Sequence, residues 1–508
     1  MKTTTVLAAA AKAALLYIPI ALAQTPNCEE PLTPSYPAPV VGSGWVARLV
    51  VTGLKDPRGL LFDSSGNLLV VEQESGIRRI RFADGGETCL EVSENTQVIQ
   101  NDQLTHGIAF SNDGKTLFAS TPQEVLAWDY DAATASVSGD QKVVINEMNN
   151  RGHATRTLLM SQKVPGMLLV SQGSGENDDP LARDASSGIS QIRAFNVSVL
   201  PDEPYTYASP SAGALLGWGL RNSVGVAEEP TTGGIFSVEN SVDDIERDGV
   251  DIHQDNPGEE LNFHGFLNGS GGGGQGGNYG YPECYAVWDP SASGLGALEI
   301  GDQFTPSTSD VSTDSVCSDD FVAPRLTWPA HTAPLDIKFT PDGSEAYVSF
   351  HGSWDRTNPA GYVLASVTFA DGEPVAARTS NTSLRSILSN SDLKRCPDSC
   401  FRPAGLALDS AGRLYMSSDS TGEIYVLAQA EMTATGGEQP PSDNNNEAGD
   451  AESSAGRSVI ALRGLFPGGG GGGGSRSSKE GSAVWAWVFV ILSAFLAGWV
   501  VGGAGRRA

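Results

Sequence analysis

The sequence has 508 residues, of which 40% are hydrophobic, and it contains 60 glycines and 29 prolines. This richness in turn-forming residues favours an all-β fold, because glycine and proline interrupt helices and form tight turns. The 60 acidic residues outnumber the 32 lysines and arginines, which gives a formal net charge of -28. A surface this acidic repels nucleic acid and anionic lipid, so we exclude nucleic acid as a partner.

The first predicted element is a secretory signal peptide over residues 1–23. A positive charge at Lys2 is followed by an apolar run that ends in Ala21-Leu22-Ala23, which has the small-residue pattern of a cleavage site. A buried N-terminal helix is the alternative interpretation of this run. We expect the mature chain to begin near Gln24 and to be extracellular.

The cysteines agree with secretion. There are six, an even number that suits disulfide bonding in an oxidising compartment, and sequential pairing is the simplest connectivity. None of them has the spacing of a zinc site. N-glycosylation sequons at Asn196, Asn268 and Asn381 also fit passage through the secretory route. The six cysteines are Cys28, Cys89, Cys284, Cys317, Cys396 and Cys400.

Residues 24–430 are predicted to form a β-propeller of about six blades, because a strand, Asp/Gly turn and strand pattern recurs along them. The aspartate or asparagine caps each turn and the glycine supplies a positive φ. Long inserted loops between Val224 and Pro334 blur the period. The repeats are clearest at Leu60 to Val71, Ile108 to Phe118, Ile337 to Val348 and Leu406 to Met416.

Polar residues lie just ahead of or within these hairpins, where a propeller gathers side chains around its central channel. Taken singly, each histidine is more often structural, and each arginine more often an ion-pair partner. Their shared position in the blades favours a functional pocket, and a ring of arginines indicates an anionic ligand such as a polycarboxylate or phosphate. The residues are Arg58, His106, His153, Arg156, Arg221, Asn222, His331, His351 and Arg402.

Four motifs resemble one known family. They are Gly219-Leu220-Arg221-Asn222-Ser223-Val224-Gly225, Asn256-Pro257-Gly258-Glu259-Glu260-Leu261-Asn262, Gly277-Asn278-Tyr279-Gly280-Tyr281-Pro282 and Arg402-Pro403-Ala404-Gly405. Together and in this order they look like the glucose/sorbosone dehydrogenase family of soluble quinoproteins. The resemblance is closest to the fungal pyranose dehydrogenases that depend on pyrroloquinoline quinone (PQQ), and it covers roughly residues 40 to 428.

The resemblance implies two catalytic residues. His153 is similar to the family's general base, which takes the proton of the sugar's anomeric hydroxyl, and an ordered Arg156 nearby would keep the imidazole neutral. Arg221 corresponds to the arginine that polarises a quinone oxygen. The implied substrate is a pyranose sugar, either an aldose or a keto-aldose.

The resemblance also implies a cofactor site for PQQ and Ca²⁺. Arg402 is similar to the arginine that grips a PQQ carboxylate, and Asn222 to a residue that contacts PQQ. The segment Gln254-Asp255-Asn256 falls where family members offer backbone carbonyls to Ca²⁺. Where bacterial members carry a lysine, this chain has His351-Gly352-Ser353-Trp354-Asp355-Arg356, which looks like the fungal variant. The remaining predicted cofactor-binding residues are Arg58, His106, Arg156, His351 and Trp354.

Two other functions stay open. One is a propeller without catalytic activity that binds glycan or protein at the cell surface, since one fold hosts many functions. The other is a Ca²⁺-dependent lactonase or esterase, which needs a carboxylate-lined site, and the arginine ring argues against it. If the protein is a dehydrogenase, its electrons pass to a separate acceptor such as a cytochrome or quinone, because the sequence has no Cys-x-x-Cys-His haem motif.

The C-terminal part is predicted to tether the propeller. Residues 431–482 are rich in Ser, Asn, Glu, Gly and Pro, and we expect a disordered linker there. Residues 483–505 carry no charge and are long enough to cross a bilayer. The terminal arginines favour a transmembrane helix, whereas the small residues and polar spacer upstream also resemble a GPI-anchor signal. Either anchor would hold the enzyme outside the cell.

Overall fold

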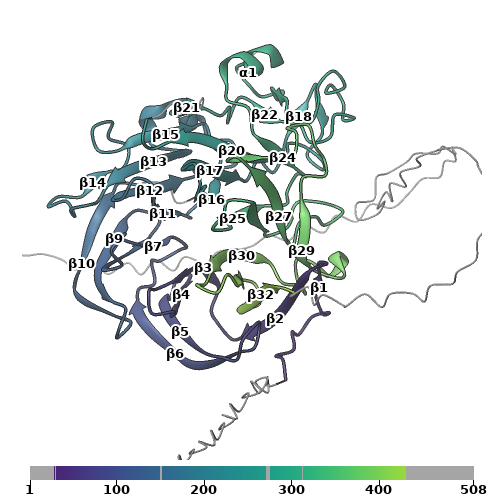
Figure 1. Cartoon of the computed structure of the whole chain (residues 1–508). Coiled ribbons are helices and arrows are strands. Elements are labelled where there is room, and N and C mark those ends of the chain that lie inside the picture. The colour runs from purple at the N-terminus through teal and green to yellow at the C-terminus, as the bar shows by residue number, and fades with distance from the viewer. Residues whose placement is uncertain (1–27, 29, 149–151, 270–274, 312, 431–508) are drawn as a thin grey trace, which may run out of the picture. The chain divides into compact units, whose positions relative to one another are not determined.

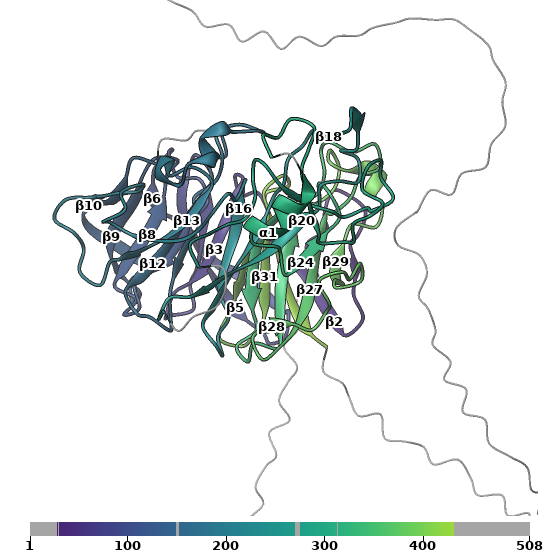
Figure 2. The ribbon, with the colours of Figure 1, turned by 90° about the horizontal axis from the view of Figure 1, so that it is seen from above.

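The computed structural model describes residues 28, 30–148, 152–269, 275–311 and 313–430. The described part of the chain contains six mainly antiparallel sheets arranged as blades around a common axis (Figure 1). Seen from the side, the strands run between two opposite poles (Figure 2). This arrangement confirms the predicted all-β, six-bladed propeller.

Each blade has four strands, and three blades gain short extra strands. The first blade comprises β3 (Pro57–Phe62), β4 (Leu68–Glu72), β5 (Gly76–Asp84) and β6 (Leu90–Gln100). The second comprises β7 (Ile108–Phe110), β8 (Thr116–Ser120), β9 (Val125–Asp131) and β10 (Ser136–Asn146), extended by β14 (Tyr205–Thr206). The third comprises β11 (Leu158–Met160), β12 (Met167–Gln172), β13 (Gln191–Asn196) and β15 (Ala214–Trp218), extended by β21 (Gly277–Asn278).

The fourth blade leads into the last two. The fourth blade comprises β16 (Ser223–Glu228), β17 (Gly234–Glu239), β20 (Glu259–Phe266) and β24 (Leu326–Trp328). The fifth comprises β25 (Pro334–Phe339), β26 (Glu345–Phe350), β27 (Val363–Ala370) and β29 (Arg385–Ser389), extended by β1 (Val40–Val41) and β28 (Glu373–Pro374). The sixth comprises β30 (Pro403–Leu408), β31 (Leu414–Ser418), β32 (Glu423–Gln429) and β2 (Trp45–Val51).

The last blade closes the ring with strands from both ends of the propeller. The N-terminal strand β2 pairs antiparallel with the C-terminal strand β32, with Trp45 opposite Gln429. The innermost strands of successive blades also contact one another in a closed circle, from β3 through β7, β11, β16, β25 and β30 back to β3. Closure covers the inner edge of each blade with its neighbours and brings the starts of the innermost strands together around the axis.

The turn between β3 and β4 shows how the repeated sequence pattern forms a hairpin. The carboxylate of Asp63 accepts hydrogen bonds from the backbone N–H groups of Ser65, at 2.9 Å, and Asn67, at 2.8 Å. Gly66 has a φ of 79°, a conformation that strains most other residues. The aspartate and the glycine of the repeat therefore have separate roles in one turn.

Apolar side chains fill the spaces between blades. Phe236 lies between the blades of β17 and β25. The centre of its ring is 5.0 Å from the ring centre of Phe263, 5.8 Å from that of Phe339 and 5.4 Å from that of Phe369. Burying a side chain of this size contributes about 1.5–3 kcal/mol to stability. Each blade thus depends on its neighbours for its core.

The inserted region between β17 and β25 adds elements that the sequence did not reveal. They are the two-stranded sheets β18 (Glu246–Arg247) with β19 (Val250–Asp251) and β22 (Tyr285–Ala286) with β23 (Gln303–Phe304), and helix α1 (Asp314–Asp320). Short 3-10 helices are η1 (Pro180–Arg183), η2 (Ala185–Ser187) and η3 (Leu393–Arg395).

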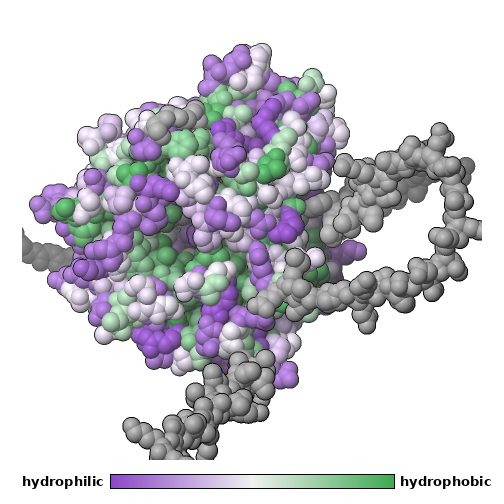
Figure 3. Space-filling model, viewed as in Figure 1, coloured by the Kyte–Doolittle hydropathy of each residue, from purple (hydrophilic) through white to green (hydrophobic). Residues whose placement is uncertain are grey.

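The cysteines pair sequentially, as expected. The disulfides are Cys28–Cys89, Cys284–Cys317 and Cys396–Cys400. On the surface seen in Figure 3, hydrophilic and hydrophobic residues are interspersed. No helix among the described residues is long and apolar enough to span a membrane. The predicted signal peptide (1–23), linker (431–482) and anchor (483–505) all lie outside the described residues.

Candidate active site

The predicted pocket residues gather at one pole of the propeller. In an antiparallel hairpin the start of the first strand and the end of the second lie at the same edge. Arg58 is the second residue of β3, and Arg402 directly precedes β30. His351 directly follows β26, the second strand of its blade. His106, His153, Arg156, Arg221 and Asn222 precede the innermost strands β7, β11 and β16.

His153 is oriented by a neutral partner. Its Nδ1 lies 2.9 Å from both the backbone oxygen and the hydroxyl oxygen of Ser174. Because the Ser174 hydroxyl donates its own hydrogen to the carbonyl of Glu176, at 2.7 Å, Nδ1 must be the donor to Ser174. Nε2 of the neutral ring then carries a lone pair, and it has no hydrogen-bond partner among the described residues. The imidazole can therefore accept a proton at Nε2.

The surroundings of His153 keep it neutral. Burial, followed by the positive charge of Arg221, lowers the pKa of His153 to about 4. The hydrogen bond that Nδ1 of His153 donates to the backbone oxygen of Ser174 opposes this shift, and Arg156 has a smaller effect in the same direction as Arg221. The sequence interpretation gave Arg156 the leading role, but burial and Arg221 matter more.

A glycine lets His153 and Asn222 come close together. A Cβ atom on Gly173 would lie 2.6 Å from Oδ1 of Asn222 and 2.9 Å from Cβ of His153. Real Cβ atoms do not approach other atoms this closely, so only glycine fits here without displacing a neighbour. The side-chain amide of Asn222 makes no hydrogen bond within the part of the chain that the structure describes. It can therefore hydrogen-bond to a ligand.

Arg221 is buried and extensively hydrogen-bonded. Its Nη2 donates to Oδ1 of Asn177, at 2.7 Å, and to Oδ2 of Asp243, at 2.8 Å. Nη1 donates to the carbonyl of Ser241 at 2.6 Å, and Nε to the carbonyl of Asn177 at 3.2 Å. The guanidinium is thus fixed beside His153 and acts on it through its charge. A longer contact of 3.4 Å, from Nη1 to the carbonyl of Asn240, is the weakest of the set.

Arg156 supports the site from within the protein. The residue is 0% exposed, and its Nη1 donates to the carbonyl of His153, at 2.6 Å, and of Thr155, at 2.9 Å. These bonds brace the backbone that carries His153.

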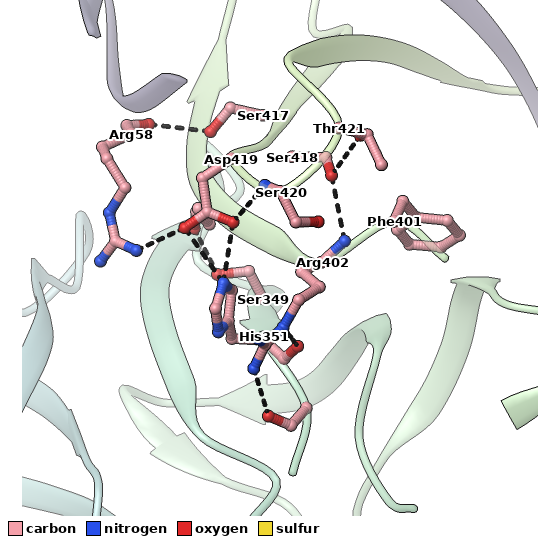
Figure 4. Close-up of polar contacts among 12 residues, drawn as sticks. Arg58, Ser349, His351, Phe401, Arg402, Ser417, Ser418, Asp419, Ser420 and Thr421 are labelled. Atoms are coloured by element: carbon pink, nitrogen blue, oxygen red, sulfur yellow. Dashed lines mark hydrogen bonds and ion pairs between the residues drawn. The ribbon is translucent and has the colours of Figure 1, made fainter. Parts of the chain in front are cut away.

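On another side of the pole, Arg58 and His351 contact Asp419, and Arg402 lies beside His351 (Figure 4). Nη1 of Arg58 lies 2.6 Å from Oδ2 of Asp419, and Nε2 of His351 lies 2.8 Å from Oδ1. Arg402 donates to the carbonyls of His351, at 3.2 Å, and Gly352, at 2.9 Å, and its guanidinium lies 5.6 Å from the ring centre of Tyr362. Nη2 of Arg58 and Nη1 of Arg402 have no hydrogen-bond partner among the described residues, so both can bind an anion.

His106 is buried just ahead of β7, the innermost strand that contacts both β3 and β11. Its Nδ1 is buried without a partner in the described structure. Burial and the charges of Arg58 and Lys338 hold the pKa of His106 well below its usual value. A buried ring nitrogen without a hydrogen bond is costly, so this atom fits contact with a bound ligand.

The segment Gln254-Asp255-Asn256 offers backbone rather than side-chain oxygens. Asp255 is ion-paired with Arg356 at 2.6 Å, and the side chain of Asn256 is bonded to the backbone of Trp288 and Asp289. None of the three backbone carbonyls of this segment accepts a hydrogen bond within the described residues. Those residues also include no cluster of three or more acidic, histidine or cysteine side chains that could hold a metal. A hard cation here would therefore be bound by carbonyl oxygens.

Trp354 lies in the loop that follows His351, and it is 68% exposed. The same loop contacts the 254–256 segment, because the backbone N–H of Thr357 donates to Oε1 of Gln254 at 2.9 Å. The loop of Trp354 therefore lies beside segment 254–256, but most of the Trp354 side chain faces solvent.

Sequence reasoning missed several residues of the site. Asp419 and Ser174 follow the second strands β31 and β12, whereas the prediction concentrated on residues ahead of the first strands. His351 also follows a second strand, β26, so a search of the residues after second strands could have found both. Asn177 and Asp243, which fix Arg221, lie in loops and carry no comparable signal.

Comparisons with known proteins identify relatives of this chain. A family model described as TrAA12-like matches residues 39–430. A pyrroloquinoline quinone-dependent sugar dehydrogenase of Hypocrea jecorina is 50% identical over 408 residues, which cover 79% of this chain and 92% of that protein. A pyrroloquinoline quinone-dependent pyranose dehydrogenase of Coprinopsis cinerea is 37% identical over 403 residues, which cover 76% of this chain but only 54% of that protein.

A solved structure supports the same relationship. It is described as the calcium structure of a Trichoderma reesei Carbohydrate-Active Enzymes Family AA12 protein, and it is 51% identical in sequence. The match has a TM-score of 0.77 and covers 79% of this chain and 100% of that one. From its six-bladed fold, its polar pole and these matches, we conclude that the chain belongs to the TrAA12-like family, with the fungal PQQ-dependent sugar dehydrogenases as its relatives.

Proposed function

We propose that this protein is a PQQ- and Ca²⁺-dependent dehydrogenase that oxidises a pyranose sugar at its anomeric carbon. The observation that carries the proposal is the oriented, neutral His153, whose free Nε2 lies at the same pole as unpartnered arginine donors. The relatives' names, which specify PQQ and sugar or pyranose substrates, support the same chemistry.

The residues present fit the cofactor. PQQ is a polycarboxylate, and Arg58 and Arg402 each keep guanidinium donors without partners in the described structure. The orphaned Nδ1 of His106 and the free amide of Asn222 add polar contacts. The carbonyls of 254–256 would hold Ca²⁺, which prefers oxygen ligands. Arg58, His106, Asn222, His351 and Arg402 would thus bind the cofactor.

When bound, PQQ supplies an acceptor for the hydride that leaves the anomeric carbon. His153 would take the proton of the anomeric hydroxyl at Nε2, so that the sugar loses a hydride and a proton and becomes a lactone. The Nδ1 hydrogen bonds to Ser174 hold the ring in the tautomer that this role needs. The charge of Arg221 disfavours early protonation of His153 and would stabilise negative charge that develops beside it.

We also propose that the enzyme works outside the cell and passes its electrons to a separate cytochrome or quinone. The three disulfides support an oxidising compartment. A C-terminal tether, either a transmembrane helix or a GPI anchor, would keep the enzyme at the surface. Release from intact cells by a phosphatidylinositol-specific phospholipase C would identify the GPI form, and retention would identify the helix.

The test of the main proposal is a calorimetric titration of PQQ into the purified protein, with Ca²⁺ and with a chelator, followed by dye-linked oxidation of a panel of sugars. We expect tight binding only with Ca²⁺, and turnover of at least one pyranose. Absence of PQQ binding under both conditions would overturn the proposal and favour a propeller that binds glycan or protein.

A further inference from the structure

The pair formed by His351 and Asp419 has an unusual consequence for anion binding. The Asp419 carboxylate accepts from Nε2 of His351, at 2.8 and 3.0 Å, from Nη1 of Arg58, at 2.6 Å, and from the backbone N–H of Ser420, at 2.7 Å. Burial acts to raise the pKa of Asp419, but His351 and Arg58 outweigh burial and hold it well below its usual value. Asp419 is therefore ionised and can only accept hydrogen bonds.

It follows that Nε2 of His351 carries a hydrogen whether the ring is neutral or charged. In the neutral ring Nδ1 then has only a lone pair. Nδ1 makes no hydrogen bond among the described residues, and the side chain is 17% exposed. Nδ1 is thus the single atom of this pair that can gain or lose a proton.

Charged groups from three elements act on His351. Asp419, after β31, favours the imidazolium form, whereas Arg402, ahead of β30, and Arg58, on β3, oppose it. Burial is the largest influence and, with the arginines, lowers the pKa of His351 below its ordinary value. Without a ligand the ring is therefore neutral at pH 7. An anion bound beside the two arginines would reverse this balance.

We propose that binding of the anionic cofactor at this pole is coupled to uptake of a proton at Nδ1 of His351, and that Asp419 is the positioning residue that makes this coupling effective. A ligand carboxylate only accepts hydrogen bonds, so it is repelled by the lone pair of a neutral Nδ1 and attracted by a protonated one. The inference rests on the proposed function, because the anion in question is PQQ.

The coupling predicts how affinity depends on pH. For each proton taken up on binding, the affinity weakens about tenfold per pH unit, at pH values between the pKa of the group in the free protein and its pKa in the complex. PQQ carboxylates are already ionised in this range, so the dependence reports His351. Asp419 matters because its charge offsets that of the two arginines; without it, protonation would require a lower pH.

The experiment is calorimetric titration of PQQ into the Ca²⁺-loaded protein between pH 6 and 9, in pairs of buffers with different ionisation enthalpies, which counts protons directly. For the unaltered protein we expect uptake of about one proton per PQQ and a matching slope in the dissociation constant. His351→Gln should abolish both. Asp419→Asn should move the loss of affinity to lower pH and weaken binding at pH 8 about tenfold. Thermal unfolding of each variant checks that it is folded.

Asp84→Asn is the matched control, because Asp84 is also a carboxylate paired with an arginine, Arg413, at 2.6 Å. That pair is next to the turn between β30 and β31, at the opposite end of those strands. This variant should bind PQQ with unchanged proton uptake. PQQ binding without proton uptake, or with uptake that His351→Gln leaves intact, would overturn this inference alone. A complete absence of PQQ binding would instead overturn the proposed function and the inference with it.

Discussion

Two histidines at the same pole of this propeller have opposite partners. Nδ1 of His153 donates to the neutral backbone and hydroxyl oxygens of Ser174, whereas Nε2 of His351 donates to the ionised carboxylate of Asp419. Arg221 lies near His153 and discourages its protonation, while the charge of Asp419 encourages protonation of His351. A histidine with a neutral partner is thus suited to accept a proton, and one with an ionised partner is suited to contact an anion.

The largest expected effect separates these two roles. His153→Gln should lower kcat by about 10²–10⁴-fold, which is the usual contribution of a general base, and leave the affinity for PQQ unchanged. His351→Gln should do the reverse, weakening PQQ binding while kcat at saturating PQQ is retained. Steady-state rates and calorimetry on both variants make the comparison. Equal losses of kcat in His153→Gln and His351→Gln would show that the two histidines do not have separate roles.

The next effect tests how closely the His153 side is packed. Gly173→Ala places a Cβ atom 2.6 Å from Oδ1 of Asn222, so His153 or Asn222 must move. A displacement of about 1 Å at a catalytic group costs on the order of 10²-fold in kcat/KM. Gly296→Ala is the control, because a Cβ there meets nothing within 4 Å. If both variants keep full activity, the packing of this side is not critical.

The pH dependence of the rate follows from the low pKa of His153. Since burial and Arg221 lower that pKa to about 4, the base stays neutral at all higher pH values. We expect kcat/KM to be independent of pH between about 6.5 and 5, and to fall about tenfold per unit only below pH 4. The measurement is the initial rate after brief exposure of the enzyme to each pH. Recovery of full activity on return to pH 7 separates titration of His153 from acid unfolding. A decline beginning near pH 6.5 would contradict this environment for His153.

The smallest expected effect concerns the support of Arg402. The ring of Tyr362 lies beneath its guanidinium, and Tyr362 packs against both Cys396 and Cys400. Replacing both cysteines with serine should loosen this stack and weaken PQQ binding about two- to fivefold, the range of one cation–π contact, without a change in kcat. The control is the same double replacement at Cys28 and Cys89. A loss of kcat rather than of PQQ affinity would show that the surroundings of Arg402 and those of His153 do not act independently.

Much of this architecture could be predicted from the sequence because it repeats. The Asp/Gly turns of residues such as Asp63 and Gly66 mark each hairpin, and the order of hairpins gives the blades. Polar residues ahead of or within these hairpins, such as His153, His351 and Arg402, could be identified in the same way, because a propeller gathers such residues around its central channel.

The rest depends on tertiary contacts that leave no local pattern. Arg247 in β18 pairs with Asp314 in α1 at 2.8 Å, across a separation of 67 residues, so these short elements form only when the chain is folded. Asp419 is similar, because its importance comes from Arg58 and His351, which belong to other blades. Arg156 resembles the other arginines in the sequence, and only its 0% exposure reveals a supporting role.

The central claim is that His153 accepts the proton while the cofactor, held partly by His351, accepts the hydride. The most direct measurement is stopped-flow absorbance of the PQQ-loaded protein mixed with a pyranose in the absence of any electron acceptor. We predict that bound PQQ is reduced in the unaltered protein and in PQQ-saturated His351→Gln, and stays oxidised in His153→Gln. Reduction at an equal rate in His153→Gln, or no reduction of the unaltered protein by any pyranose, would contradict the account.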